Sequence, residues 1–204
     1  MPDELVPTPR GSYAKGVARR QEILDRAIEV FARRGSDRTS LRAIAEEVGV
    51  THAALRHYFG SLEELLVAVY RESETRGGAD DHDDPEATPV ELMRDWTESN
   101  REVQGLVQLY STLVATALEE GHPAAREFAT ERFSRTRADL AERVRRNQRA
   151  GRIRPDVDPL AVAALVIAAS DGLQTQWLLD PDTPQDAALA LLEVLLSAPG
   201  DASG

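Results

Sequence analysis

The stretch from residue 51 to residue 59 carries an arginine and two histidines but no acidic side chain. If it is helical, with about 100° per residue, His52, Ala53, Arg56 and His57 share an arc of roughly 140°. Arginine binds guanine through two hydrogen bonds, histidine donates to base acceptors or phosphates, and alanine lets the backbone approach the duplex. The residue types on this face therefore predict contact with DNA.

Periodicity alone leaves two other interpretations open. Helix pairs of this kind also occur in all-helical proteins that never contact DNA. The two histidines raise the possibility of a metal site. However, His52 and His57 lie roughly 140° apart around a helix, so they cannot bind one ion from the same face.

The elements that must position this face directly precede it. Residues 40–48 predict a short amphipathic helix, and Gly49 predicts a tight turn that ends at Thr51, the cap of the next helix. On that next helix, Leu55 and Phe59 fall within roughly 40° of each other and predict the side that docks on the preceding helices. Two short helices across a glycine turn are typical of a helix-turn-helix, whose second helix enters the major groove.

The whole chain reads as all-α, because sustained period-2 alternation and Asn-Gly or Asp-Gly hairpin turns are missing. Capping residues mark several helix starts, namely Ser61, Thr88, Asp158 and Thr183. Glycines at 35, 49, 60, 121 and 151 mark helix ends. Together these signals predict about nine helices, at 16–33, 40–48, 51–58, 62–77, 89–99, 102–120, 123–150, 159–179 and 184–197.

Charge is distributed unevenly along the 204 residues, whose formal net charge is −11. Residues 1–60 hold 10 basic and 8 acidic side chains, a balance of +2, whereas residues 61–204 hold 14 basic and 27 acidic ones, a balance of −13. This asymmetry suggests a charge-specialised segment joined to a different, acidic part of the chain.

Several classes of function find no support in the sequence. The chain has no cysteine, which excludes disulfides, cysteine-based zinc sites and a thiol nucleophile. Glycine-rich phosphate loops and the HExxH and GxSxG motifs are absent, so we expect no enzyme, cofactor or metal. The acidic segment 80–84 fits a solvated loop better than a cation cage. The longest stretch without a polar side chain, Leu160–Ala169, is too short to span a bilayer, and no signal peptide is evident, so we expect a cytoplasmic protein without membrane contact.

Residues 19–70 resemble the DNA-binding domain of TetR-family transcriptional regulators. The matching positions are Ile23, Leu24, Ala27, Phe31, Gly35, Thr39, Ser40, Ile44, Ala45, Gly49, Val50, Thr51, Leu55, Phe59, Ser61, Glu63, Leu65 and Leu66. The resemblance implies DNA contacts by Thr39, Ser40, Arg42, Thr51, His52, Ala53, Arg56, His57 and Tyr58. Two positions depart from the family pattern: Arg56 stands where tyrosine is usual, and Leu62 where a phosphate-binding lysine is usual.

The resemblance also assigns parts of the chain. It implies a helix-turn-helix domain at 15–61 and a ligand-binding and dimerisation domain at 62–198. The composition of the two ends, 1–14 and 199–204, predicts that they are disordered. The N-terminal arm carries four basic residues, Arg10, Lys15, Arg19 and Arg20. This arm either contacts phosphates or the minor groove of DNA, or it is a solubilising tail.

The last two helices, 159–179 and 184–197, are apolar on almost every side, so they must be covered on every side. A second copy of the chain is a natural cover, and the resemblance implies a homodimer through these helices that binds a palindromic DNA operator. The alternative is a core within one chain.

The resemblance also implies that the middle helices hold a pocket for a small, largely apolar effector of unknown identity. Large or amphipathic residues there are Met93, Trp96, Tyr110, Phe128, Phe133, Gln174 and Trp177. Plain core packing is the alternative for each of them. We therefore expect a ligand-responsive regulator that acts as a repressor, with a regulator governed by a protein partner as the alternative.

Overall fold

The computed structural model describes residues 9–34, 41–76 and 84–198. These residues form nine helices and no strand beyond an isolated bridge between Ile153 and Ser197. The helices are α1 (Pro9–Arg34), α2 (Leu41–Val48), α3 (His52–Phe59), α4 (Leu62–Arg76), α5 (Pro89–Arg101), α6 (Gln104–Thr116), α7 (Pro123–Arg149), α8 (Pro159–Leu179) and α9 (Gln185–Leu196). The predicted all-α class is confirmed.

Local capping accounts for several helix starts. Thr88 and Glu91 form the reciprocal capping box of α5, with N–H to oxygen distances of 3.1 and 2.7 Å. Asp158 accepts a hydrogen bond from the Ala161 N–H at 2.8 Å at the start of α8. The prediction for Thr183 was wrong, because Pro184 is the N-cap of α9 and makes no side-chain capping bond.

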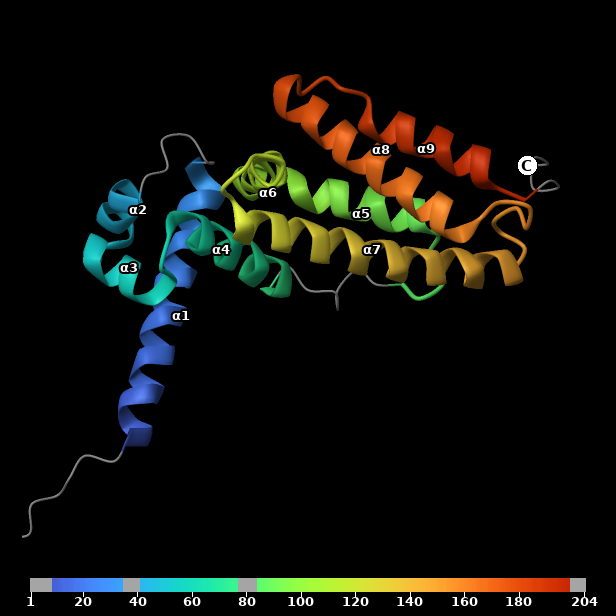
Figure 1. Ribbon diagram of the computed structural model, residues 1–204. Helices are drawn as coiled ribbons and strands as arrows, with labels where there is room; N and C mark the ends of the chain where they lie inside the picture. Colours follow the sequence, from blue (N-terminus) through green and yellow to red (C-terminus); the bar gives the residue numbers. More distant parts are fainter. Residues whose placement is uncertain (1–8, 35–40, 77–83, 199–204) are drawn as a thin grey trace, which may run out of the picture.

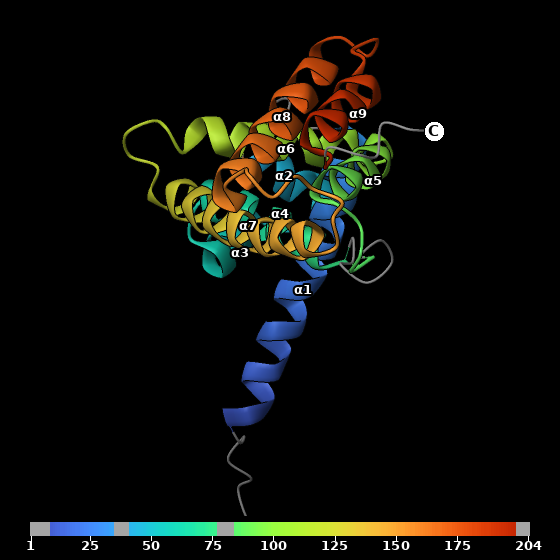
Figure 2. The same cartoon turned by 90° about the vertical axis from the view of Figure 1, so that its right-hand side faces the viewer.

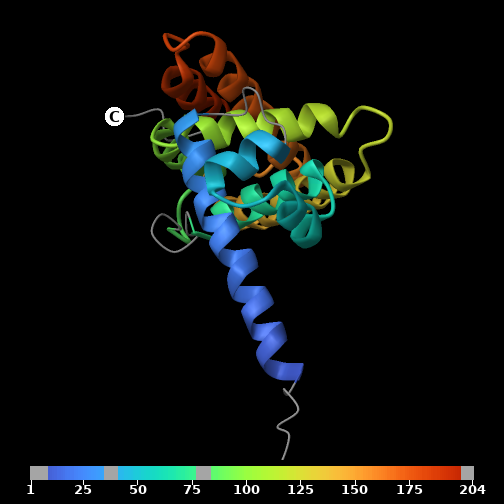
Figure 3. The ribbon, with the colours of Figure 1, turned by 90° about the vertical axis from the view of Figure 1, so that its left-hand side faces the viewer.

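The first helix differs most from the prediction. It begins at Pro9, seven residues before the predicted start, so residues 9–14, expected to be disordered, are helical. The N-terminal turns of α1 project away from the rest of the molecule in the side views (Figures 2 and 3).

Two apolar clusters support the fold. The first joins α1–α4 to α6 and the N-terminal half of α7, and includes Phe31, Leu55, Leu109 and Phe128. It therefore crosses the expected domain boundary at residue 61, and α1–α3, which we call the head, pack directly on α5–α9, which we call the body. The second cluster lies among α5, α7, α8 and α9, and Phe133 packs against both.

The helices are arranged with the head at one end. α2 and α3 lie beside α1, α7 runs along the body, and α8 and α9 lie side by side at the edge remote from α2 and α3 (Figure 1). α4 follows α3 directly and packs against both α1 and α7, so it connects the head to the body.

Candidate DNA-binding interface

α3, the predicted recognition helix, is fixed from its buried side. Leu55 is completely buried and Phe59 nearly so, and both belong to the first apolar cluster. The Arg20 guanidinium lies over the Phe59 ring, 4.9 Å from its centroid. Thr51 caps the helix by accepting a hydrogen bond from the Ala54 N–H at 3.1 Å.

The opposite side of α3 is open to solvent. His52, Ala53, Arg56 and His57 are all exposed, as the helical spacing predicts, and α3 contains no acidic residue. Tyr58 is half-buried and makes an edge-on contact with the His57 ring at 5.1 Å between centroids. A compact basic and polar surface therefore faces outward from a rigid core.

The helix before the turn contributes less than expected to this surface. Arg42 is exposed, and its guanidinium pairs with Glu46 at 3.2 Å along α2. An exposed pair of this kind is weak, so the guanidinium is free to exchange the carboxylate for a phosphate. Thr39 and Ser40 lie outside the described residues.

The turn between α2 and α3 is held by Arg26, a residue that the sequence analysis missed. Gly49 has φ +73°, a left-handed conformation that favours glycine. The Arg26 guanidinium donates to the carbonyl of Val48 at 2.9 Å and pairs with Glu22 at 3.1 Å. Arg26 therefore stabilises the C-terminal end of α2, where unpaired carbonyls favour a cation. The only sequence signal for this role is the position of Arg26 on α1, three residues after the buried Ile23.

Leu62, at the position usually held by a phosphate-binding lysine, is half-buried and packs against the first apolar cluster. The first turn of α4 carries two acidic residues, Glu63 and Glu64, and no basic one. The first turn of α4 therefore supplies no cationic side chain for a phosphate contact at this end of the head.

The seven residues proposed to line an effector pocket are spread over the body. Met93 belongs to the second apolar cluster, Tyr110 and Phe128 to the first, and Phe133 lies between the two. Gln174 and Trp177 are half-buried on α8, and Trp96 is exposed. The structure thus brings Tyr110, Phe128 and Phe133 toward one region. None of the seven lines the groove between α1, α4 and α7 or the groove between α5 and α9.

Tyr110 belongs to a buried polar group between α4, α6, α7 and α8. Its hydroxyl donates to Asp171 at 2.9 Å, its ring stacks on Tyr70, and the Arg132 guanidinium lies 4.5 Å from its ring centroid. Arg132 also pairs with Glu74 at 3.0 Å. Burial raises the pKa of Tyr70 to about 12 and the pKa of Asp171 above its ordinary value. Sequence patterns did not single out Arg132 or Asp171, because their partners lie on other helices.

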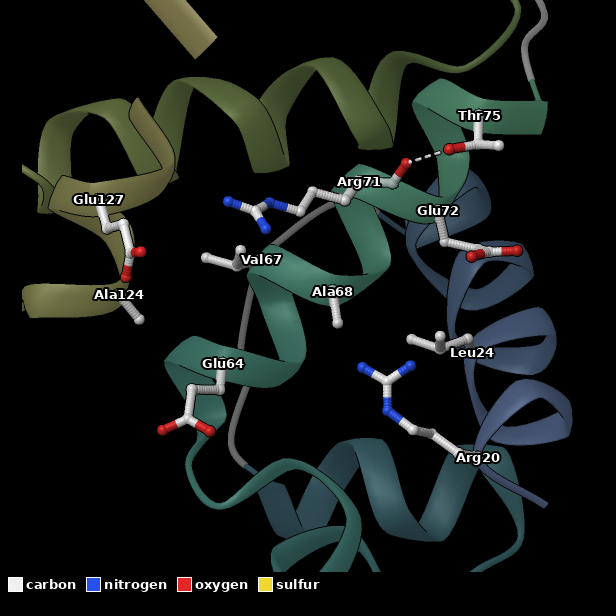
Figure 4. Close-up of a pocket in the computed structure, with 10 residues that line it drawn as sticks. All are labelled: Arg20, Leu24, Glu64, Val67, Ala68, Arg71, Glu72, Thr75, Ala124 and Glu127. Atoms are coloured by element: carbon white, nitrogen blue, oxygen red, sulfur yellow. Dashed lines mark hydrogen bonds between the residues drawn. The ribbon is translucent and has the colours of Figure 1, made fainter. Parts of the chain in front are cut away.

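One groove of about 350 Å³ lies between α1, α4 and the start of α7. Figure 4 shows Arg20 and Arg71 reaching into it, with Glu64 on α4 and Glu127 on α7 at its edge. The groove borders the head.

Comparison with known proteins decides the family. Residues 23–69 match the model of bacterial regulatory proteins of the tetR family, and residues 100–198 match the C-terminal model of BetI-type transcriptional repressors. The HTH-type transcriptional repressor AcnR of Corynebacterium diphtheriae is 32% identical over 139 residues, which cover 68% of this chain and 70% of AcnR. The chain belongs to the TetR family.

Two further relatives cover more of this TetR-family regulator. The HTH-type transcriptional repressor Rv1474c of Mycobacterium tuberculosis is 28% identical over 90% of this chain and 94% of its own length. The structure of the multidrug binding protein EbrR, complexed with imidazole, matches with a TM-score of 0.62 and 28% identity over 90% of this chain and 92% of EbrR. The protein is therefore a DNA-binding transcriptional repressor and not an enzyme.

Proposed function

We propose that this TetR-family repressor acts as a homodimer that binds a palindromic operator in double-stranded DNA, in the cytoplasm, and is released by a small, largely apolar effector. One observation carries the DNA-binding part of this proposal. The exposed, acid-free face of α3 presents His52, Arg56 and His57 on a helix whose other face is locked in the core.

Each residue of the proposed interface has a separate role. Arg56 and His52 contact base edges in the major groove, and Ala53 allows the backbone to approach. Thr51, His57 and Tyr58 contact the sugar-phosphate backbone and fix the register. We include Thr39, Ser40 and Arg42 as phosphate or groove-edge contacts. The proposed interface therefore consists of Thr39, Ser40, Arg42, Thr51, His52, Ala53, Arg56, His57 and Tyr58.

The projecting start of α1 supplies a further DNA contact in this proposal. Lys15 is exposed and Arg19 is half-buried on that segment, and α1 reaches beyond the body (Figures 2 and 3). Basic residues at the free end of this helix would extend the positively charged surface that attracts the DNA phosphates.

An exposed apolar stripe on α8 and α9 supports the homodimer. The buried side of α8 consists of Val162, Ala163, Val166 and Ile167. Its opposite side and the outer side of α9 leave large apolar side chains in solvent, namely Leu160, Leu165, Leu179, Leu191, Val194 and Leu195. We call these six residues the apolar stripe. α8 is also long and apolar enough, by length and composition alone, to cross a membrane. Its packing against α5, α6, α7 and α9 favours a helix–helix interface instead.

The effector site is proposed around Tyr110, Phe128 and Phe133, which combine aromatic surface with the polar group at Asp171. The relative EbrR, a multidrug binding protein complexed with imidazole, supports a small-molecule ligand. The second candidate, control by a protein partner, is motivated by the acidic character of residues 61–204, which carry a charge balance of −13.

Binding to operator DNA tests the proposal. Palindromic sites selected from randomised DNA are expected to bind the protein at submicromolar concentration with a steep dependence on salt. Arg56→Ala should weaken binding by about 1–3 kcal/mol and relax base preference at one symmetric position of the operator.

The matched control is Arg137→Ala, which removes an exposed arginine from α7 in the body and should leave binding unchanged. A uniform loss across all sequences would assign Arg56 to a phosphate. Absence of any palindrome-selective binding by the wild-type protein would refute the proposed function.

A further inference from the structure

The N-terminus of α7 is capped by a side chain from another helix. His122, the N-cap residue of α7, makes no side-chain capping bond. Instead, Oε1 of Glu63 accepts a hydrogen bond from the Ala125 N–H at 2.6 Å. The first N–H groups of a helix lack intrahelical partners and carry partial positive charge, so a carboxylate at this point forms a strong, charge-assisted contact.

Glu63 is also tied closely to the recognition helix. It lies in the first turn of α4, four positions after Phe59, the last residue of α3. Between them, Gly60 adopts φ +72° and Ser61 accepts a hydrogen bond from the Glu64 N–H at 3.1 Å. Because the connection is this short and internally bonded, a displacement of Glu63 is passed on to α3.

The contact between α4 and the start of α7 borders an open groove on one side. Ala124 and Glu127, in the first turns of α7, line the groove of about 350 Å³ that residues of α4 and α1 also line (Figure 4). Farther along, Arg71 of α4 pairs with Glu131 of α7 at 2.5 Å. Polar links therefore connect α4 with the first part of α7 beside the open groove.

The imidazole of His122 lies beside the same Glu63 carboxylate. Nδ1 of His122 is buried without a hydrogen-bond partner and lies 3.6 Å from Oε2 of Glu63, while Nε2 lies 3.8 Å from Glu119. The Glu63 side chain is only 17% exposed. Both oxygens of Glu63 thus face the start of α7, which holds the carboxylate in one orientation.

We propose that Glu63 is a positioning residue that sets the placement of the recognition helix relative to the body by capping α7. Through this contact, the position of α7 in each subunit determines the separation of the two recognition helices in the dimer. This inference rests on the proposed function, because spacing has meaning only for a dimer on a two-part operator.

The test measures affinity against half-site spacing. Operators with the selected half-sites are made with the central spacing changed in single base-pair steps, and the full-length protein is titrated against each. The wild-type protein should prefer one spacing. Glu63→Ala should reduce the preference for that spacing over its neighbours by about tenfold, the effect expected from losing one charge-assisted hydrogen bond.

Two variants separate positioning from simple helix stability. Glu63→Gln keeps an oxygen acceptor for the Ala125 N–H and should retain most of the wild-type spacing preference. Glu63→Ala combined with His122→Ser supplies a local cap to α7. This double variant should recover the melting temperature while its spacing preference stays reduced.

The outcomes are distinct. A wild-type spacing preference in Glu63→Ala, an equal loss in Glu63→Gln, or a recovery of spacing preference by the local cap would each overturn the inference. If the wild-type protein binds no palindrome at any spacing, the proposed function itself fails.

Discussion

The apolar stripe on α8 and α9 makes a quantitative prediction about dimerisation. Leu191 is 60% exposed on α9, next to Val194 and Leu195 one turn away. Full burial of a leucine side chain contributes about 1.5–3 kcal/mol, so covering this exposed fraction contributes roughly 1–2 kcal/mol. A two-fold interface contains the residue twice, and the loss is therefore roughly 2–4 kcal/mol per dimer.

Leu191→Arg is expected to weaken the dimer at least about 100-fold, because it removes this burial and places two guanidinium groups in the interface. Sedimentation velocity over a range of protein concentrations measures the change. Leu118→Arg is the matched control, since Leu118 is 82% exposed on the connection between α6 and α7, outside the stripe. An unchanged dimer in Leu191→Arg, or equal dissociation in Leu118→Arg, would show that the reasoning from the stripe is wrong.

Two further predictions concern the stability of the body. Burial raises the pKa of Asp171, so its contribution to stability is present at low pH and is lost as the pH rises through its folded-state pKa. Asp171→Asn should therefore unfold at a higher urea concentration than wild type at pH 7, with a difference that shrinks as the pH falls through the folded-state pKa and is smallest below about pH 4; a constant difference from pH 7 down to pH 4 would contradict this. Arg143 is buried and donates to the carbonyls of Asp84 and Ala87 at 2.5 and 3.1 Å. Arg143→Met should lower the free energy of unfolding by roughly 2–3 kcal/mol in the same assay, and an unchanged midpoint would argue against the role of these bonds.

Local signals in the sequence predicted most of the fold. Thr51, Thr88 and Asp158 cap helices through bonds to N–H groups three residues ahead, so the sequence contains both partners. Gly49 and Gly60 end helices with positive φ values for the same local reason. The division of α3 into a buried and an exposed face followed from helical period alone, because Leu55 and Phe59 define the buried side.

The missed features depend on contacts between distant residues. Glu63 and Ala125 are 62 positions apart, and Tyr110 and Asp171 are 61 apart, so no spacing rule connects them. The early start of α1 also has a local signal in the sequence. Thr8-Pro9 is the same kind of pair as Asp158-Pro159, with a capping residue directly before a proline.

The distance of α3 from the apolar stripe has a genetic consequence. A chain with a defective α3 and an intact α8 and α9 would still pair with normal chains. If the two are made in equal amounts and pair at random, about three quarters of the dimers contain at least one defective subunit. Alleles that damage α3 are therefore expected to be dominant over the wild type, whereas alleles that destroy α8 or α9 are expected to be recessive.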